Sequence, residues 1–233
     1  MRINGFEGVS LIDYPGKVSS IVYTSPCNFK CPFCHNPSLV GVNDDVLGVD
    51  EIINEISERR GFIEGVTLSG GEPLMQDDLG LFIEILREMG LKVKLDTNGY
   101  FPERLKTLLD KKMVDYVAMD IKSSPEKYQF ACGVKASMEN IVESIALIRE
   151  SGAEYEFRTT VVPGIVDEDD IAGIGEMISG AELFSIQQFR NDRTYDDLYK
   201  KVIPYSDEKL SIFAETMKQY VKKVKILNTA ELA

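Results

Sequence analysis

Short runs of β-branched and aromatic residues alternate with amphipathic segments along most of this 233-residue chain. The run Val18–Thr24 is typical of a strand, whereas Val49–Arg60 places its apolar residues on one helical face and ends at Gly61. The alternation predicts roughly six β-α units, and therefore an α/β fold with a parallel sheet that is either rolled into a barrel or open. We find no internal repeat, low-complexity tract or linker, so we expect one domain over residues 1–233.

The same patterns give expected bounds for each element. Strands are predicted at 18–24, 66–68, 92–95, 114–122, 154–162, 183–189 and, at the end, 224–227. Helices are predicted at 49–60, 77–89, 102–111, 137–150, 168–178 and 206–222. In the segment 6–16 only the turn Tyr14-Pro15-Gly16 is predicted.

Polar residues gather where the predicted strands end. In a barrel of β-α units these ends form the active face. They carry a cysteine loop, Gly70-Gly71-Glu72, Asp96-Thr97, Asp120 with Lys122, and Gln187-Gln188. Alternation along the strand puts Asp120 and Lys122 on one face, where burying an acid and a base requires pairing or a ligand. Asp120 and Lys122 could therefore bind a ligand or form a structural ion pair, and the sequence leaves both roles open. Arg158 could equally be a structural cation or contact an anionic group.

The cysteine loop follows the first predicted strand directly. Cys27, Cys31 and Cys34 have the spacing C-x3-C-x2-C, and a loop of this kind can wrap three thiolates around one iron–sulfur cluster. In a four-iron cluster, three thiolates leave one iron open for chemistry. Cys132 lies far from this loop in sequence and is interpreted as a small, half-buried thiol.

Other interpretations of the loop remain open from these residues alone. Cys31 to His35 also matches the C-x-x-C-H of covalent haem attachment, although this leaves Cys27 unexplained. A zinc site needs a fourth ligand, and His35, directly after Cys34, is badly placed for the same tetrahedron. A disulfide is disfavoured because nothing in the sequence indicates export.

Composition excludes several classes of function. A net charge of −12 and the lack of a basic stripe argue against nucleic acid or an anionic membrane as the main partner. We expect a cytoplasmic protein with reduced thiols, because no apolar signal core or transmembrane-length run is present. His35 is the only histidine, so catalytic triads and multi-histidine metal sites are disfavoured. His35 itself is either a turn residue or a supporting residue near the cluster.

Together these residues resemble the radical S-adenosylmethionine (SAM) superfamily. The C-x3-C-x2-C loop, with Phe33 before its last cysteine, and Ser69-Gly70-Gly71-Glu72-Pro73 at the end of the second predicted strand are similar to its cluster and SAM-binding motifs. Within the superfamily, the glycyl-radical-enzyme activases are most similar, through segments such as L-D-T-N-G-Y, M-D-I-K and R-T-T-V-V-P-G. This resemblance favours the cluster over haem and zinc. It implies a partial (β/α)6 barrel of the TIM type, with parallel strands and an open side that admits a protein loop.

The resemblance also implies roles for single residues. Cys27, Cys31 and Cys34 would hold a 4Fe–4S cluster whose fourth iron binds the amino and carboxylate groups of SAM. The remaining implied SAM contacts are Phe33 near the adenine, Ser69, Gly70, Gly71 and Glu72 at the methionine end, and Asp120, Lys122 and Arg158. Asp96 and Thr97, together with Asp120, resemble a monovalent-cation site. The activases carry a histidine near the cofactor at the last strand, whereas this chain has Ile186-Gln187-Gln188 there.

The implied activity is reductive cleavage of SAM to a 5′-deoxyadenosyl radical, which removes hydrogen from a glycine of a partner enzyme. Anaerobic ribonucleoside-triphosphate reductase is the first expected partner, with pyruvate formate-lyase as the alternative, and the expected reductant is a flavodoxin- or ferredoxin-type protein. Two other functions remain: a radical SAM enzyme acting on a small molecule or peptide, and a cluster protein that only relays electrons.

Overall fold

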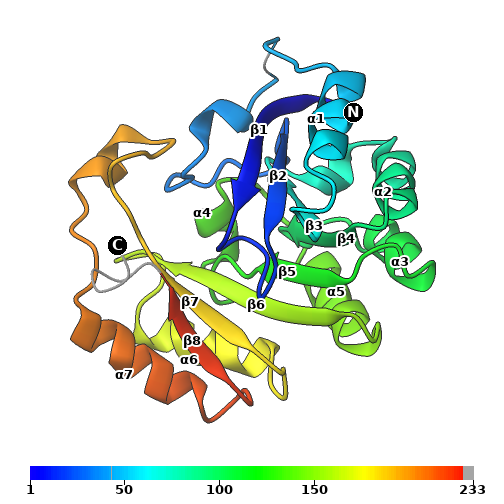
Figure 1. The fold of residues 1–233 in the computed structure, drawn as a ribbon. Coiled ribbons are helices and arrows are strands. Elements are labelled where there is room, and N and C mark those ends of the chain that lie inside the picture. Colours follow the sequence, from blue (N-terminus) through cyan, green and yellow to red (C-terminus); the bar gives the residue numbers. More distant parts are fainter. Residues whose placement is uncertain (43, 228–233) are drawn as a thin grey trace.

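Seven parallel strands follow one another in chain order and curve around a common interior (Figure 1). The computed structural model describes residues 1–42 and 44–227. Its sheet has the order β1-β2-β3-β4-β5-β6-β7-β8, so β1 and β8 are the two edges and the barrel is open between them. The strands are β1 Ile3–Ser10, β2 Ser19–Thr24, β3 Gly65–Gly70, β4 Lys92–Thr97, β5 Tyr116–Asp120, β6 Glu154–Val161, β7 Phe184–Gln188 and β8 Val224–Leu227.

Helices connect the parallel strands and cover the outer face of the sheet (Figure 1). They are α1 Val49–Glu58, α2 Leu79–Glu88, α3 Pro102–Asp110, α4 Tyr128–Cys132, α5 Met138–Glu150, α6 Glu168–Met177 and α7 Asp207–Met217, with short 3-10 helices η1 Pro37–Leu39, η2 Pro73–Met75 and η3 Asp197–Lys201. Strands β2 to β7 are each followed by a helix before the next parallel strand, so the six predicted units and the partial barrel are confirmed.

Strand β1 differs from the prediction, because it pairs antiparallel with β2 and was expected only as part of a turn region. Its sequence contains Gly5 and Gly8, which hide the strand pattern. Gly5 has a packing reason, because a Cβ there would lie 3.2 Å from the Tyr23 ring, whereas a Cβ on Gly8 would meet only the flexible end of the Arg59 side chain, at 2.7 Å. The sheet is therefore parallel from β2 to β8 only.

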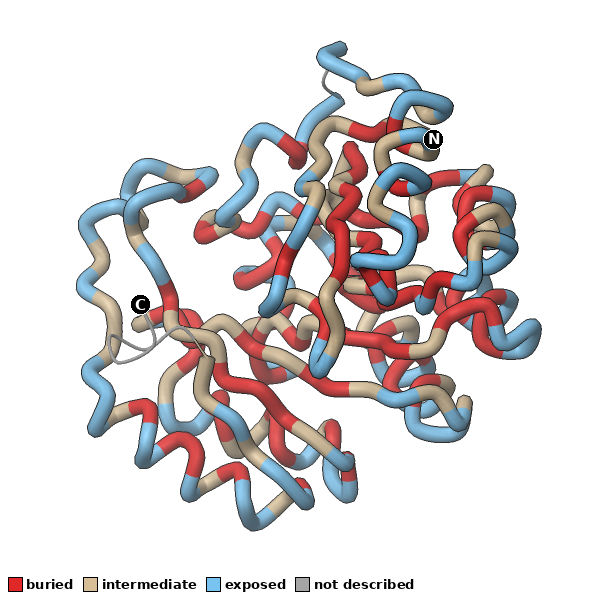
Figure 2. The backbone as a smooth tube through the Cα atoms, in the orientation of Figure 1, coloured by how far each residue is buried: buried red, intermediate tan, exposed pale blue. Residues whose placement is uncertain are grey.

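The apolar core lies mainly between the sheet and the helices, and strands β2 to β5 are buried along most of their length (Figure 2). Val117, Met119 and Ile121 of the β5 segment face this core, as the alternation predicted. On the opposite side, Tyr14, Tyr116 and Ala118 form a separate small cluster. The Tyr14 ring packs beside the first residues of β3 and β5, so the β1–β2 hairpin closes the bottom of the barrel interior.

None of the helices in residues 1–42 and 44–227 is both long enough and apolar enough to cross a bilayer.

Candidate active site

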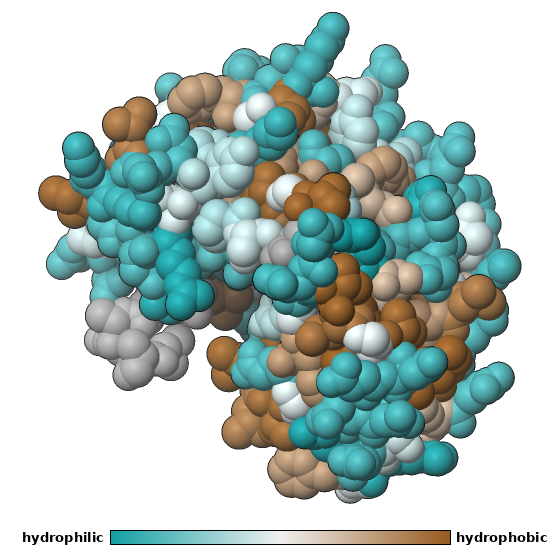
Figure 3. All heavy atoms as spheres, turned by 90° about the horizontal axis from the view of Figure 1, so that it is seen from above, coloured by the Kyte–Doolittle hydropathy of each residue, from teal (hydrophilic) through white to brown (hydrophobic). Residues whose placement is uncertain are grey.

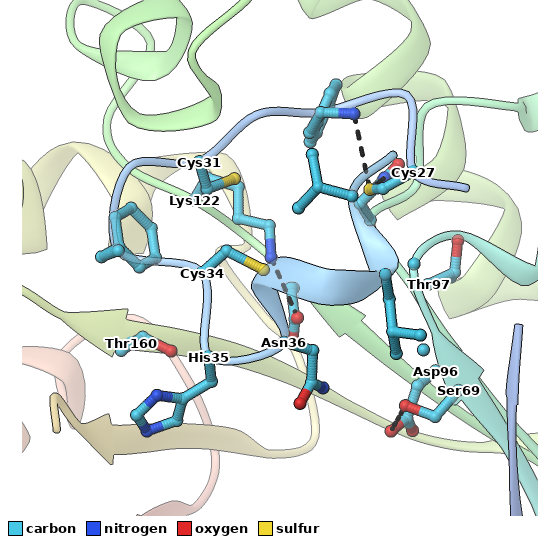
Figure 4. Close-up of a pocket in the computed structure, with 18 of the residues that line it drawn as sticks. Cys27, Cys31, Cys34, His35, Asn36, Ser69, Asp96, Thr97, Lys122 and Thr160 are labelled. Atoms are coloured by element: carbon cyan, nitrogen blue, oxygen red, sulfur yellow. Dashed lines mark hydrogen bonds and ion pairs between the residues drawn. The ribbon is translucent and has the colours of Figure 1, made fainter. Parts of the chain in front are cut away.

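A cavity of about 370 Å³ lies at the carboxyl ends of the strands. Its wall contains most of the residues singled out in the sequence, and Figure 4 shows how their side chains surround it. The predicted residues that line it are Cys27, Cys31, Phe33, Cys34, Ser69, Gly70, Gly71, Asp96, Thr97, Asp120, Lys122 and Arg158. Strand ends and a cysteine loop that are far apart in the sequence therefore meet at one place.

The cysteine loop is held mainly by main-chain hydrogen bonds to distant segments. Cys27 N donates to Val40 O over 3.2 Å, and Lys30 N donates to Cys132 O over 2.8 Å. Asp196 N donates to Pro32 O over 2.9 Å, which brings the segment after β7 beside the loop (Figure 1). A loop fixed by its own backbone can present three side chains without a regular element beneath them.

The three loop thiols surround a common space rather than one point (Figure 4). Among residues 1–42 and 44–227, no three His, Cys, Asp or Glu side chains are gathered closely enough to hold a single metal ion. This geometry does not build a mononuclear zinc site, whereas thiols spread around a cavity suit a larger cluster. Burial raises the pKa of Cys27 to about 11 and that of Cys31 to about 12, so cluster binding must displace thiol protons.

Cys132 and His35 lie outside the group formed by the three loop thiols. Cys132 is buried at the end of α4, and its thiol contacts the carbonyl oxygens of Gln129 and Val134. His35 lines the rim of the cavity, and its Nδ1 lies 3.1 Å from Arg193 O. His35 therefore connects the cysteine loop to the segment after β7.

Gly70 and Gly71 let the end of β3 pass close to the cysteine loop. Gly71 N donates to Thr24 O over 2.8 Å, and a Cβ on Gly71 would lie 2.6 Å from Pro26 O. Gly70 has a φ of +118°, a conformation that side chains disfavour, and a Cβ there would lie 2.4 Å from Thr24 N. The diglycine is therefore required by close backbone packing at the cavity wall.

Glu72 lies behind this wall and does not line the cavity. Its carboxylate accepts hydrogen bonds from Thr97 Oγ1 at 2.8 Å, Asn98 N at 2.7 Å and Leu74 N at 3.1 Å. Burial raises its pKa to about 7, although these hydrogen bonds oppose the shift. Glu72 thus ties the end of β3 to the end of β4, and the direct SAM contact expected for it stays a prediction.

A network of ion pairs forms the opposite wall. Asp120 binds Lys122 Nζ at 3.0 Å and Arg158 Nε at 2.9 Å. Arg158 also reaches Asp96 Oδ2 at 3.4 Å, across β5, where the small Ala118 is in register with Asp96. Ser69 Oγ donates to the same Asp96 oxygen over 3.1 Å. The ion pair of Asp120 and Lys122, one of the two possibilities that the alternation of β5 left open, is therefore present, and its network extends over four strands.

The charges of this network set one another's ionisation. Burial alone would raise the pKa of the Asp120 carboxyl, but the charges of Arg158 and Lys122 outweigh it and hold that pKa below its ordinary value. Burial alone would lower the pKa of Lys122, but Asp120 outweighs it and raises that pKa above its ordinary value. Asp120, Lys122 and Arg158 are therefore all ionised at neutral pH, in the same cavity as the cysteine thiols.

Two polar residues at this site were not singled out from the sequence. Asn98 donates through Nδ2 to the Cys27 thiol at 3.8 Å and to Asn28 Oδ1 at 2.8 Å. The sequence feature that could have identified Asn98 is its position directly after Asp96-Thr97 at a strand end. Lys94 is buried beneath the cavity and pairs with Asp96. The sequence feature that could have identified Lys94 is its position in the middle of a strand, two residues before an aspartate.

Comparison with known proteins shows the family. Residues 21–172 match the radical SAM superfamily. A Methanocaldococcus jannaschii protein, provisionally named a glycyl-radical enzyme activating enzyme, is 36% identical over 96% of this chain and 95% of its own length. The pyruvate formate-lyase-activating enzyme of Staphylococcus aureus is 29% identical over 78% of this chain and 76% of its own length.

Solved structures agree on the fold. SuiB of Streptococcus suis, bound to the precursor peptide SuiA, superposes with a TM-score of 0.69 at 15% identity over 90% of this chain and 48% of SuiB. The chain thus spans about half of SuiB. QueE from Escherichia coli superposes with a TM-score of 0.57 at 12% identity over 97% of this chain and 92% of QueE. The chain belongs to the radical SAM superfamily, which uses a 4Fe–4S cluster and SAM.

Proposed function

We propose that this chain, as one domain of residues 1–233, activates a glycyl radical enzyme. Its first proposed partner is anaerobic ribonucleoside-triphosphate reductase. The observation that carries the proposal is that a cysteine loop and a charged set of strand ends face one cavity in a chain that is 36% identical, over nearly its whole length, to a protein provisionally named as such an activase. An enzyme rather than an electron carrier is favoured because charged side chains beside the thiols prepare a binding site for a second molecule.

Different residues of the site would bind the cluster and SAM. Cys27, Cys31 and Cys34 would hold the cluster, which when bound supplies the electron that cleaves SAM to methionine and a 5′-deoxyadenosyl radical. The ionised Lys122 and Arg158 would receive the cofactor's carboxylate, and the close-packed wall at Gly70 excludes water from behind. We propose a flavodoxin- or ferredoxin-type protein as the reductant.

A protein substrate fits the open side of the barrel. Strands β1 and β8 do not pair with one another, and seen from above the molecule is hollowed between two lobes (Figure 3). Beside the cysteine loop, the segment after β7 exposes the apolar side chains of Tyr195, Leu198 and Ile203, which are 45%, 68% and 83% accessible. Apolar side chains on a rim are typical of protein interfaces. The rim and the opening together support a partner loop that brings its glycine to the cavity.

The test is an electron paramagnetic resonance spectrum of reduced, cluster-loaded protein mixed with SAM and the reductase without oxygen. We expect a glycine-centred doublet, and no doublet when the partner's radical-site glycine is replaced by alanine. Pyruvate formate-lyase is the second partner to try, since its activating enzyme is a relative. Small molecules that stimulate 5′-deoxyadenosine release, while no glycyl radical enzyme gives a doublet, would contradict the proposal.

A variant of the rim separates docking from chemistry. In the double variant Leu198→Asp, Ile203→Asp, we expect the doublet to form about tenfold more slowly, because charge opposes burial of the rim against a partner. Release of 5′-deoxyadenosine without a partner should stay at the level of the unaltered protein. Ile212→Asp on α7, whose side chain is also exposed, is the matched control.

A further inference from the structure

The Asp96 carboxylate pairs with cationic side chains of this chain. Asp96, Thr97 and Asp120 resemble a monovalent-cation site, and such a site requires their oxygens to be available to the ion. Both carboxylate oxygens of Asp120 are occupied, Oδ1 by Arg158 Nε and Oδ2 by Lys122 Nζ. The Thr97 hydroxyl donates to Glu72 Oε1 at 2.8 Å, on the side away from the cavity.

Asp96 is occupied in the same way. Its Oδ2 atom accepts from Ser69 Oγ and lies 3.4 Å from Arg158, and its Oδ1 atom binds Lys94 Nζ. All four carboxylate oxygens of Asp96 and Asp120 thus have cationic or hydroxyl partners within the chain. A sodium or potassium ion could bind these oxygens only in place of, or directly beside, the ammonium and guanidinium groups that already contact them.

Lys94 is unusual for a lysine because only 2% of its side chain is accessible. It stands two residues before Asp96 on β4, so both side chains point into the barrel. Its ammonium lies beneath the cavity and 5.9 Å from the centre of the Tyr116 ring. This contact of a cation with an aromatic face supports a charged amine inside the barrel.

The charge balance supports the same reading. Lys94, Lys122 and Arg158 supply three positive charges to the network, and Asp96 and Asp120 supply two negative charges. The buried Glu156, on the same strand as Arg158 and close enough to raise its pKa, supplies a third negative charge. These groups therefore balance one another without a metal ion. A metal cation would add an uncompensated positive charge among groups that are already paired, and like charges at these distances repel strongly.

We propose that Lys94 is a built-in counter-cation for Asp96 that takes the place of a bound monovalent metal ion. It is a positioning residue: it fixes Asp96, which in turn holds Arg158 and Ser69 at the cavity wall. SAM binding by this chain consequently does not depend on sodium or potassium. The inference rests on the cofactor of the family and is independent of the partner enzyme.

The first arm of the test uses the unaltered, cluster-loaded protein. Its dissociation constant for SAM is measured by isothermal titration calorimetry in potassium, sodium or tetramethylammonium chloride at equal ionic strength. We expect the three constants to agree within about twofold. A tenfold or larger tightening in potassium or sodium over tetramethylammonium would overturn the proposal.

The second arm removes the ammonium with Lys94→Met. In tetramethylammonium chloride we expect SAM binding to weaken about tenfold, the usual effect of losing one charged contact. Potassium or ammonium ions should restore most of this loss, which a purely structural defect would not allow. Lys92→Met is the matched control, because Lys92 lies on the same strand but pairs with Asp115 at the surface. Equal affinity of Lys94→Met and the unaltered protein in every salt would contradict the proposal.

A double variant separates the charge effect from packing. In Lys94→Met, Asp96→Asn both charges are absent, so we expect no response to potassium. A potassium response as large as that of the single variant would mean that Asp96 is not the group that Lys94 neutralises. Should Lys94→Met fail to fold, the salt series of the unaltered protein decides the question. Since every readout is binding, a missing glycine-centred signal would count against the proposed function alone.

Discussion

The two walls of the cavity are held together in different ways. The cysteine loop is fixed by main-chain hydrogen bonds to segments as distant as Cys132 and Asp196. The strand-end wall is fixed by ion pairs between the side chains of Asp96, Asp120 and Arg158. A wall made of backbone tolerates changes of nearby side chains but not of glycines. A wall made of ion pairs tolerates small backbone shifts, whereas the loss of a charge changes what it can bind.

The largest expected effect is on the cysteine wall. Cys27→Ala, Cys31→Ala or Cys34→Ala should each abolish cluster assembly, because each removes one of three thiol ligands. Cys132→Ala should keep the cluster, since Cys132 contributes its carbonyl oxygen to the loop and not its thiol. Iron content and the visible absorption of anaerobically reconstituted protein measure the result. Loss of the chromophore in Cys132→Ala would show a fourth protein ligand.

The backbone of this wall is tested by Gly71→Ala. The new Cβ would meet Pro26 O at 2.6 Å and Leu39 O at 2.8 Å, and main-chain carbonyls cannot rotate away. We expect a loss of about 1–3 kcal/mol in the free energy of unfolding, together with reduced iron content. Gly41→Ala is the control, since a Cβ there meets nothing within 4 Å. Equal stability of the two variants would mean that the loop is freer than its contacts indicate.

The ion-pair wall is tested by Lys122→Ala. We expect SAM binding to weaken by about 2 kcal/mol, which corresponds to roughly 30-fold in the dissociation constant, at unchanged iron content. Asp120 keeps its pair with Arg158, so the fold should persist. Titration calorimetry measures the affinity, with Lys127→Ala, a lysine paired with Asp167 and Asp170, as the control. An unchanged affinity for SAM would mean that Lys122 has only a structural role.

At Glu72 we expect an effect on stability rather than on the binding of SAM. Glu72 connects the two walls, because its main-chain N–H donates to Pro26 O and its carboxylate accepts from Thr97 and Asn98. Its pKa of about 7 lies above the ordinary 4.5, so the folded state binds this proton more tightly than the unfolded chain does. The contribution of Glu72 to stability should therefore fall by about 3 kcal/mol as pH rises from 4.5 to 7.

This pH dependence is measured as the difference in Tm between the unaltered protein and Glu72→Gln, which cannot titrate. We expect the unaltered protein to lose stability relative to the variant across this range. Asp120 provides the contrast, because its lowered pKa gives stability that is present above about pH 4 and is lost only as pH falls below that value. Parallel Tm curves for the two proteins between pH 5 and 8 would show that Glu72 has an ordinary pKa.

The sequence revealed the ion-pair wall better than the cysteine wall. Period-2 alternation placed Asp120 and Lys122 on one face of β5, because a strand fixes the direction of its side chains. Spacing identified the three cysteines but not what holds their loop, since hydrogen bonds from Lys30 to Cys132 leave no local pattern. The strand β1 was missed because Gly5 and Gly8 interrupt its strand pattern, and the tight packing of Gly5 on Tyr23 of β2 is defined only in the folded chain.

The role of Glu72 also lay beyond the sequence. A motif predicts which residues gather at a ligand, but not which hydrogen-bond partners each of them has within the folded chain. Whether a carboxylate faces the cavity depends on the donors behind it, here Thr97 and the backbone of Asn98. Lys94 was not predicted to be buried, because a lysine in a strand is usually exposed. It can be buried inside this barrel because Asp96, on the same face of the strand, pairs with its ammonium group.

The central claim is that the two walls together let this chain cleave SAM. The most direct measurement is the 5′-deoxyadenosine formed when cluster-loaded protein, dithionite and SAM are mixed without oxygen. The account expects product from the unaltered protein, none from Cys34→Ala, and product from Lys122→Ala that approaches the unaltered level only at high SAM concentration. No 5′-deoxyadenosine from the fully cluster-loaded protein, or equal amounts from Cys34→Ala, would contradict it.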